Sequence, residues 1–133
     1  MFSMAIVPKI RIDSSAPTAA VRQIVDQLRV LLVEGALAPG QALPAVRRVA
    51  MELGVHFNTV AEAYRQLAEE GWLELSHGRA ARVIARTPTL AAAGDRDDFR
   101  ARMRSLVAEM RSRGLEPPKL AMDLRALAEE MSK

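Results

Sequence analysis

The hydrophobic positions between residues 55 and 67 recur with the period of one helix face. Positions i, i+3, i+4 and i+7 of this stretch are occupied by Val60, Ala63, Tyr64 and Leu67, which predicts a helix with an inward apolar face. A shorter periodic run over residues 44–53 precedes it and ends at Gly54, a residue suited to the left-handed helix cap. Two short helices joined in this way predict a helix-turn-helix, whose second helix presents its N-terminal residues to the major groove.

The pattern upstream predicts one more core-forming helix. Residues 8–13 alternate apolar and polar side chains, as a short strand or an extended lead-in does. Residues 14–17, Ser-Ser-Ala-Pro, offer an N-cap and a proline for the first helical turn. Apolar residues then keep helical spacing over residues 21–32, and Gly35 ends the predicted helix.

A β-hairpin is predicted directly after the second helix of the helix-turn-helix. Gly71 ends that helix, and residues 72–75 and 81–84 then alternate around a turn at residues 76–79. Each segment alone is equally typical of a generic small α+β domain. Their order, three helices and then a hairpin with short connections, predicts a winged helix-turn-helix.

The last third of the chain predicts two helices after a linker. Residues 87–96 contain a proline and a glycine and form the predicted linker. A helix is predicted over residues 97–113, with the aspartates around its start as caps and as anions favoured by the helix dipole. After a proline pair at 117–118, a second helix is predicted to the end of the sequence.

Each of these two helices carries one apolar stripe. Two short helices cannot bury both stripes without a third surface. We therefore predict that the segment pairs with a second copy of the chain, and the alternative is that it folds back on the winged domain. The predicted dimer interface consists of Phe99, Met103, Leu106, Met110, Leu120, Leu124, Leu127 and Met131.

Composition adds few constraints. The 133 residues are 50% hydrophobic but only 4% aromatic, which predicts an aliphatic core. The absence of cysteine excludes disulfides, thiolate metal sites and cysteine nucleophiles, and the N-terminal stretch lacks the pattern of a secretory signal. No apolar run approaches the ~20 residues that span a bilayer, so a cytoplasmic protein without a membrane partner is expected. The net charge of +3 gives weak support for a nucleic-acid partner.

Five segments, in order along the chain, resemble the GntR family of bacterial transcription regulators. They are residues 23–29, 35–47, 53–60, 63–71 and 77–79, within a likeness that covers about residues 15–86. The short C-terminal part is similar to the small YtrA-like branch of the family, in which this segment is a dimerisation element. The resemblance implies a mainly α fold with a small β-hairpin. It divides the chain into a winged helix-turn-helix DNA-binding domain over 1–86, a linker over 87–96 and a C-terminal two-helix dimerisation segment over 97–133.

The resemblance also implies which residues contact DNA. In this family the arginine after Leu-Pro-x-x, here Arg47, contacts DNA from the second helix, residues 56–59 enter the major groove, and the hairpin tip reaches the minor groove or the backbone. The chain departs from the family pattern at Phe57, Ala61 and Ala80. We therefore expect its operator to differ from those of better-known family members. The predicted DNA-binding residues are Arg47, Arg48, His56, Phe57, Asn58, Thr59, His77, Gly78 and Arg79.

Three of these side chains have two possible roles each. Arg47 can present its guanidinium fork to guanine or to phosphate. Arg48 lies about 100° further around the helix and is either a second contact or a solvated surface charge. Phe57 can pack on a thymine methyl group or form a hydrophobic staple to the core.

The remaining polar residues are assigned from their chemistry and position. Asn58 can bond adenine or phosphate, and Thr59 can contact phosphate or cap the helix start. Glu62 is expected to pair with Arg65 instead of facing the phosphates. At the hairpin tip, His77 can donate to a phosphate, Gly78 permits close backbone approach, and nearby arginines add positive charge.

These patterns favour a dimeric, sequence-specific transcription regulator, a repressor that binds a palindromic operator with half-sites about one helical turn apart. The alternative is a winged-helix protein-interaction module without specific DNA binding. An enzyme is disfavoured, because two histidines without a glycine-rich phosphate loop or metal-spaced ligands form no catalytic constellation. The expected partners are double-stranded DNA and a second copy of the chain; no cofactor or metal is expected, and the sequence identifies no small-molecule effector.

Overall fold

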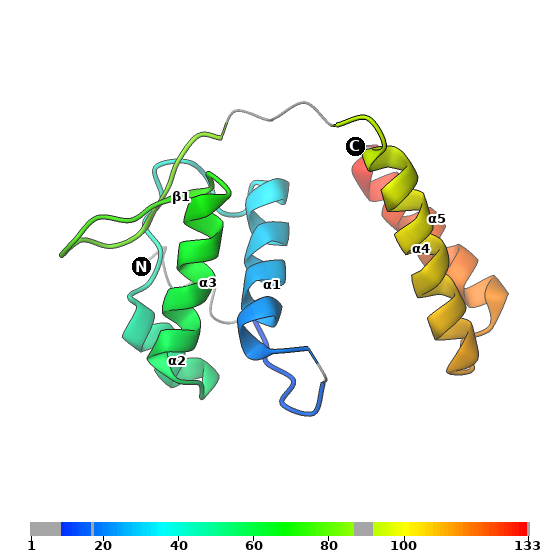
Figure 1. Cartoon of the computed structure of the whole chain (residues 1–133), viewed down its shortest axis with the longest axis horizontal. Coiled ribbons are helices and arrows are strands. Elements are labelled where there is room, and N and C mark those ends of the chain that lie inside the picture. The colour runs from blue at the N-terminus through cyan, green and yellow to red at the C-terminus, as the bar shows by residue number, and fades with distance from the viewer. Residues whose placement is uncertain (1–8, 17, 87–91, 133) are drawn as a thin grey trace. The chain divides into compact units, whose positions relative to one another are not determined.

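The chain folds into two compact units, divided between residues 87 and 88 (Figure 1). The computed structural model describes residues 9–16, 18–86 and 92–132. The first unit contains α1 (Ala20–Glu34), α2 (Val46–Leu53), α3 (Phe57–Glu69), β1 (Leu73–Glu74) and β2 (Arg82–Val83), and the second contains α4 (Asp95–Ser112) and α5 (Pro117–Met131). Three helices followed by a hairpin confirm the predicted winged helix-turn-helix.

The core of the first unit is aliphatic, as predicted. Both α1 and α2 pack against α3 (Figure 1), and the predicted inward face of α3 is buried. The least exposed large side chains come from all three helices: Ile24, Val25, Leu28, Val49, Val60 and Leu67. Each fully buried aliphatic side chain contributes about 1.5–3 kcal/mol. Because this face of α3 is committed to the core, its opposite face and its first turn are left for other contacts.

Two helices end at the glycines that were predicted to cap them. Gly35 follows α1 and Gly54 follows α2, with φ angles of 83° and 71° in the left-handed region. An L side chain is strained at such an angle. The short turn between α2 and α3 therefore depends on the glycine at position 54.

The predicted start of the first helix is wrong. α1 begins at Ala20 rather than within residues 14–17, and the residue before it supplies no side-chain cap. The hydroxyl and the N–H of Ser15 both donate to one carboxylate oxygen of Asp13, at 2.6 and 3.0 Å. This serine therefore closes a local turn instead of capping a helix; Pro17 lies outside the described residues.

The described part of the predicted lead-in, residues 9–13, forms no strand. Gln27 of α1 takes the place of a strand partner: its side-chain oxygen accepts from the N–H of Arg11 at 2.9 Å, and its amide donates to the Arg11 carbonyl at 2.7 Å. Ile10 is buried in the core. The lead-in is thus fixed along α1 by side-chain amides.

The hairpin is confirmed, and it has a neighbour that the sequence did not reveal. Leu73 lies opposite Val83 in the antiparallel β1–β2 pair. On the other edge of β2, the N–H of Val83 donates to the carbonyl of Gln41 at 2.9 Å, and the N–H of Leu43 donates to Ala81 at 2.8 Å. Residues 40–43 therefore connect the base of the hairpin to the start of α2.

A bidentate ion pair joins α1 to the end of α3. The Arg29 Nε lies 3.0 Å from Glu70 Oε1, and its Nη2 lies 2.6 Å from Oε2. Both side chains are half-buried. The hydrogen bonds from Arg29 hold the pKa of Glu70 below its ordinary value of 4.5.

This pair predicts an acid-sensitive contribution to stability. Because the pKa of Glu70 is lower in the folded chain, its carboxylate stabilises the fold above the pKa of the unfolded state, and this contribution is lost as the pH falls through the folded-state value. We expect Glu70→Gln to lower the free energy of unfolding by about 1 kcal/mol at pH 7, and by less as the solution is acidified. Chemical denaturation at pH 7 and pH 4 measures the difference. Glu69→Gln, an equal charge change at an exposed neighbour, should change little; a loss from Glu70→Gln that grows in acid would contradict the assignment.

The second unit is a pair of helices joined by residues 113–116. α4 begins two residues before the predicted start and ends at Ser112, so the predicted 97–113 boundaries are slightly wrong. The predicted aspartate caps are also wrong, because Gly94 is the N-cap residue and Asp95 accepts from the N–H of Ala92 at 2.6 Å. The aspartates lie in the first turn of α4, where the helix dipole still favours them.

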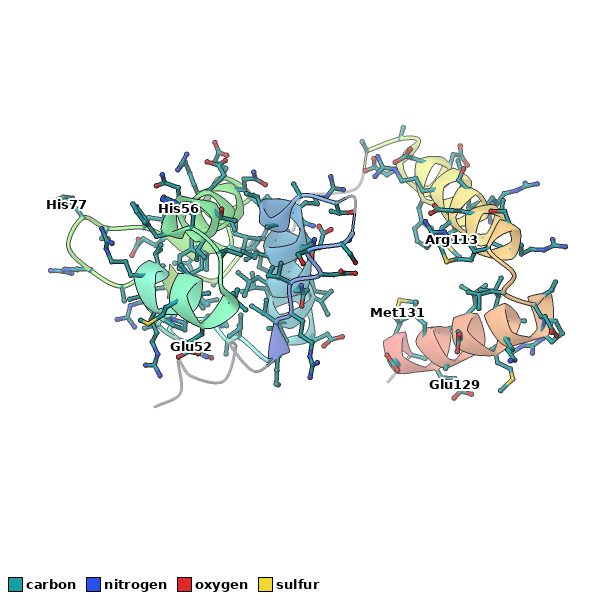
Figure 2. The ribbon with its side chains drawn as sticks, turned by 90° about the horizontal axis from the view of Figure 1, so that it is seen from below. Glu52, His56, His77, Arg113, Glu129 and Met131 are labelled. Carbon is teal, nitrogen blue, oxygen red and sulfur yellow. The ribbon has the colours of Figure 1, made fainter. Side chains whose placement is uncertain are left out.

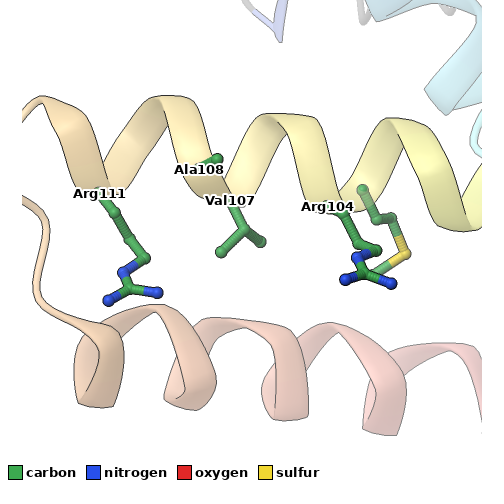
Figure 3. Close-up of a pocket in the computed structure, with 5 residues that line it drawn as sticks. Arg104, Val107, Ala108 and Arg111 are labelled. Atoms are coloured by element: carbon green, nitrogen blue, oxygen red, sulfur yellow. The ribbon is translucent and has the colours of Figure 1, made fainter.

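No residue of α4 or α5 is buried in the single chain. A hollow of about 310 Å³ is lined by α4 residues, and Figure 3 shows Arg104, Val107 and Arg111 pointing from α4 toward α5. The apolar stripes are open: Leu106 is 56% exposed and Leu127 is 53% exposed. Among the residues that the structure describes, no helix is long and apolar enough to cross a bilayer.

Candidate nucleic-acid interface

The first turn of α3 is exposed and is capped by an unexpected residue. His56 is the N-cap, and its Nδ1 accepts a hydrogen bond from the N–H of Asn58 at 3.1 Å. The alternative cap, Thr59, is wrong; its own N–H bonds the His56 carbonyl at 3.0 Å. His56, Phe57 and Asn58 are exposed and Thr59 is half-buried. Since Nδ1 accepts, Nε2 carries the proton of the neutral imidazole and can donate.

Phe57 does not form the hydrophobic staple. Its ring is 37% exposed and lies outside the buried cluster of the core. The guanidinium carbon of Arg47 lies 4.5 Å from the Phe57 ring centroid. The His56 ring stacks on Phe57, with centroids 4.6 Å apart and planes 27° from parallel. The predicted staple is wrong because Val55 and Val60, which lie on either side of Phe57 in the sequence, already pack against the core.

The two neighbouring arginines of α2 have different surroundings. Arg47 is exposed and lies over Phe57. Arg48 is half-buried, and its Nε lies 3.2 Å from Oε1 of Glu52 one helical turn away. Of these two arginines, Arg47 is therefore the one that contacts the first residue of α3.

Further along α3, the predicted pairing of Glu62 is confirmed. One carboxylate oxygen of Glu62 accepts from Arg65, and the other accepts from Gln66 at 3.2 Å. The buried hydroxyl of Tyr64 donates to the Pro44 carbonyl at 2.8 Å. Burial raises the pKa of Tyr64, so its phenol stays a donor, and it fixes the start of α2 against α3.

The hairpin tip projects away from the helices. Figure 2 shows His77 at its far end, and His77, Gly78 and Arg79 are all exposed. Gly78 has a φ of 73°, which the tight turn requires. Arg82, which also adds charge to the hairpin, donates to the Gly40 carbonyl at 2.6 Å and so braces the hairpin base.

A groove of about 540 Å³ lies between the start of α2, the middle of α3 and the hairpin. Its lining combines apolar residues such as Ala61 and Leu75 with the cations Arg65 and Arg79. A surface of this composition favours a partner with both phosphates and apolar edges. The structure thus brings α3, the hairpin and the first turn of α2 around one depression.

The comparisons with known proteins agree with this architecture. The family described as bacterial regulatory proteins, gntR family, matches residues 20–83, from the first residue of α1 to the last of β2. The HTH-type transcriptional repressor YtrA of Bacillus subtilis (strain 168) is 31% identical over 111 residues, which cover 84% of this chain and 85% of that protein. The chain belongs to the GntR family. It is a DNA-binding transcription regulator, and its relatives are regulators, not enzymes.

Two further relatives extend the likeness of this GntR protein. An HTH-type transcriptional regulator of Mycobacterium tuberculosis (strain ATCC 25618 / H37Rv) is 45% identical over 76 residues, which cover 53% of this chain and 62% of that protein. The solved structure of YtrA from Sulfolobus acidocaldarius, a GntR-family transcription factor, is 32% identical with a TM-score of 0.58, and it covers 75% of this chain and 98% of that one. The expected family and the fold are therefore confirmed. The individual DNA-contacting residues stay predictions.

Two features of the interface were missed in the sequence. His56 gave no cap signal, because serine, threonine, aspartate and asparagine are the usual capping residues. The contact of Arg47 with Phe57 joins two helices, and only the packing of α2 on α3 brings positions 47 and 57 together. In the sequence, only the departure from the family pattern at Phe57 indicated that this position has an unusual role.

Proposed function

We propose that this GntR protein is a dimeric repressor that binds a palindromic operator through the first turn of α3. The observation that carries the proposal is the exposure of His56, Phe57 and Asn58 on a helix whose opposite face is core. A helix start of this kind can enter the major groove while the rest of α3 remains packed. The hairpin tip then lies beside the same duplex.

The exposed side chains have the chemistry that base edges require. Arg47 can donate two parallel hydrogen bonds to guanine, and Asn58 can bond both N6 and N7 of adenine. His56 offers its Nε2 proton to a base or phosphate acceptor. In the hairpin, His77 and Arg79 can bind phosphates, while Gly78 allows the backbone to come close. Two predicted DNA-binding residues are less accessible for this role. Arg48 is half-buried and paired with Glu52, and Thr59 is half-buried.

The second unit supports dimerisation. The side of α4 that points toward α5 carries Val107 (Figure 3), whereas Leu106 lies about 100° away on the helix and is more than half exposed. α5 therefore cannot cover the whole α4 stripe, and a second copy would. Of the predicted interface, Met103, Met110 and Leu120 are half-buried, and the exposed members are Phe99, Leu106, Leu124, Leu127 and Met131.

A two-fold dimer would present two copies of the α3 start to one duplex. Such a protein prefers an inverted repeat with half-sites about one helical turn apart. Occupation of an operator that overlaps a promoter would block transcription. The repressor assignment is supported by the relative from Bacillus subtilis, whose name is that of a repressor.

Selection from a pool of random duplexes tests this function directly. The full chain is incubated with the pool, bound duplexes are recovered over several rounds, and the enriched sequences are read. We expect an inverted repeat with half-site centres about 10 base pairs apart. Enrichment of no sequence would reject specific DNA binding and favour the protein-interaction module. Enrichment of a single unrepeated half-site would reject the dimeric arrangement.

A further inference from the structure

We propose that Phe57 is a positioning residue whose ring fixes the guanidinium of Arg47 before DNA is bound. The inference rests on the proposed operator binding and adds a residue whose role is to orient a DNA-contacting side chain. The core staple expected for Phe57 does not describe what its ring touches within the chain. Its contacts are with the side chains of Arg47 and His56.

The contacts form a short chain from the backbone of α3 to the end of the Arg47 side chain. The N–H of Asn58 holds Nδ1 of His56 at 3.1 Å. The His56 ring stacks on Phe57 with centroids 4.6 Å apart, and the guanidinium carbon of Arg47 lies 4.5 Å from the Phe57 centroid. The helix cap thus orients His56, the His56 ring packs on Phe57, and the guanidinium rests on the Phe57 ring.

Arg47 needs such a support more than its neighbour does. Arg48 is held by Glu52, whereas among the described residues Arg47 forms no ion pair with a carboxylate. A long exposed side chain loses rotamer entropy when it binds a base. Restricting it in advance removes part of that cost.

A contact with an aromatic ring also keeps the donors of Arg47 usable. The N–H groups of a guanidinium lie in its plane, so a ring that covers its face leaves them free to bond guanine or phosphate. A carboxylate partner would occupy the same donors. An aromatic support therefore suits an arginine that must bind DNA, whereas an ion pair suits one that does not.

The contact can be measured in the protein without DNA. In the wild type, the guanidinium carbon of Arg47 lies over the Phe57 ring, so the NMR signals of the nearby Arg47 side-chain protons should be shifted upfield by the ring current. We expect Phe57→Leu to return these signals to ordinary positions, and Phe57→Tyr to retain the shift. The amide spectrum of the rest of the chain shows whether each variant is folded. An Arg47 spectrum that is the same in wild type and Phe57→Leu would overturn the proposal.

The effect on recognition is tested with the selected duplex and a double-mutant cycle of Phe57→Leu and Arg47→Ala. Phe57→Leu should weaken binding by about two- to fivefold per half-site, the factor expected for an exposed cation–π contact, and Phe57→Tyr should restore it. In the Arg47→Ala background, Phe57→Leu should have no further effect.

The other outcomes separate this proposal from its alternatives. An equal loss from Phe57→Leu with and without Arg47 would overturn it and show that Phe57 contacts DNA itself, as on a thymine methyl group. No loss at all would overturn it while operator binding stands. If the wild type enriches no duplex, operator binding fails and the positioning role fails with it, although the NMR signals would still report the ring contact.

Discussion

Replacement of Leu106 by arginine is expected to turn the dimer into a monomer and to lower operator affinity by about two orders of magnitude or more, the usual gain from linking two binding modules. Leu106 is 56% exposed in the single chain, so an arginine there is tolerated by each protomer. In a two-fold interface the substitution occurs twice, and it places two guanidinium groups in an apolar contact. Desolvation of unpaired charges costs several kcal/mol.

The molar mass in solution and the operator affinity are measured together. The chain has a mass of 14.6 kDa, so light scattering at micromolar concentration separates monomer from dimer. Ser105→Arg is the matched control, because it adds the same side chain at an exposed neighbour about 100° away on α4. A Leu106→Arg variant that keeps the dimer mass would contradict the proposed interface, and so would a wild type that binds its operator as a monomer.

The parts of the fold that follow from local pattern could be predicted from the sequence. The inward face of α3 is defined by apolar spacing alone, and Gly35 and Gly54 end their helices because a positive φ suits glycine. Helix starts do not follow from local pattern in the same way. Serine and aspartate side chains can form hydrogen bonds with neighbouring residues in several ways. Asp13 and Ser15 close a turn before α1, and Asp95, the first residue of α4, accepts from the N–H of Ala92.

Contacts between distant residues could not be predicted in this way. The pairing of residues 40–43 with β2 involves a segment too short and irregular to look like a strand. The ion pair between Arg29 and Glu70 joins residues 41 positions apart, and neither residue carries a local signal. For the same reason, the family resemblance selected the positions of the interface but gave no account of how Arg47, Phe57 and His56 contact one another.

Replacement of Arg47 by alanine is expected to weaken operator binding by about 5- to 150-fold for each half-site, the range for a bidentate arginine–guanine contact. Both protomers lose the contact, so the total effect on the dimer is larger. Arg47 is exposed at the start of α2, and its loss removes no buried contact. Only the exposed contact with the Phe57 ring is lost, so we expect the free energy of unfolding to fall by no more than about 1 kcal/mol.

Two variants and a salt titration identify what Arg47 binds. Arg48→Ala removes the same charge from the next position, where Glu52 already engages the guanidinium, so its effect should be several times smaller. Arg47→Lys keeps the charge but lacks the planar fork. If Arg47 reads guanine, Lys restores little affinity, and the preference for that base falls. If Arg47 binds phosphate, Arg47→Lys restores most of the affinity. Arg47→Ala then lowers the salt dependence of binding by about one counterion per protomer and leaves the base preference unchanged. Equal affinities of Arg47→Ala and the wild type would rule out docking through the first turns of α2 and α3.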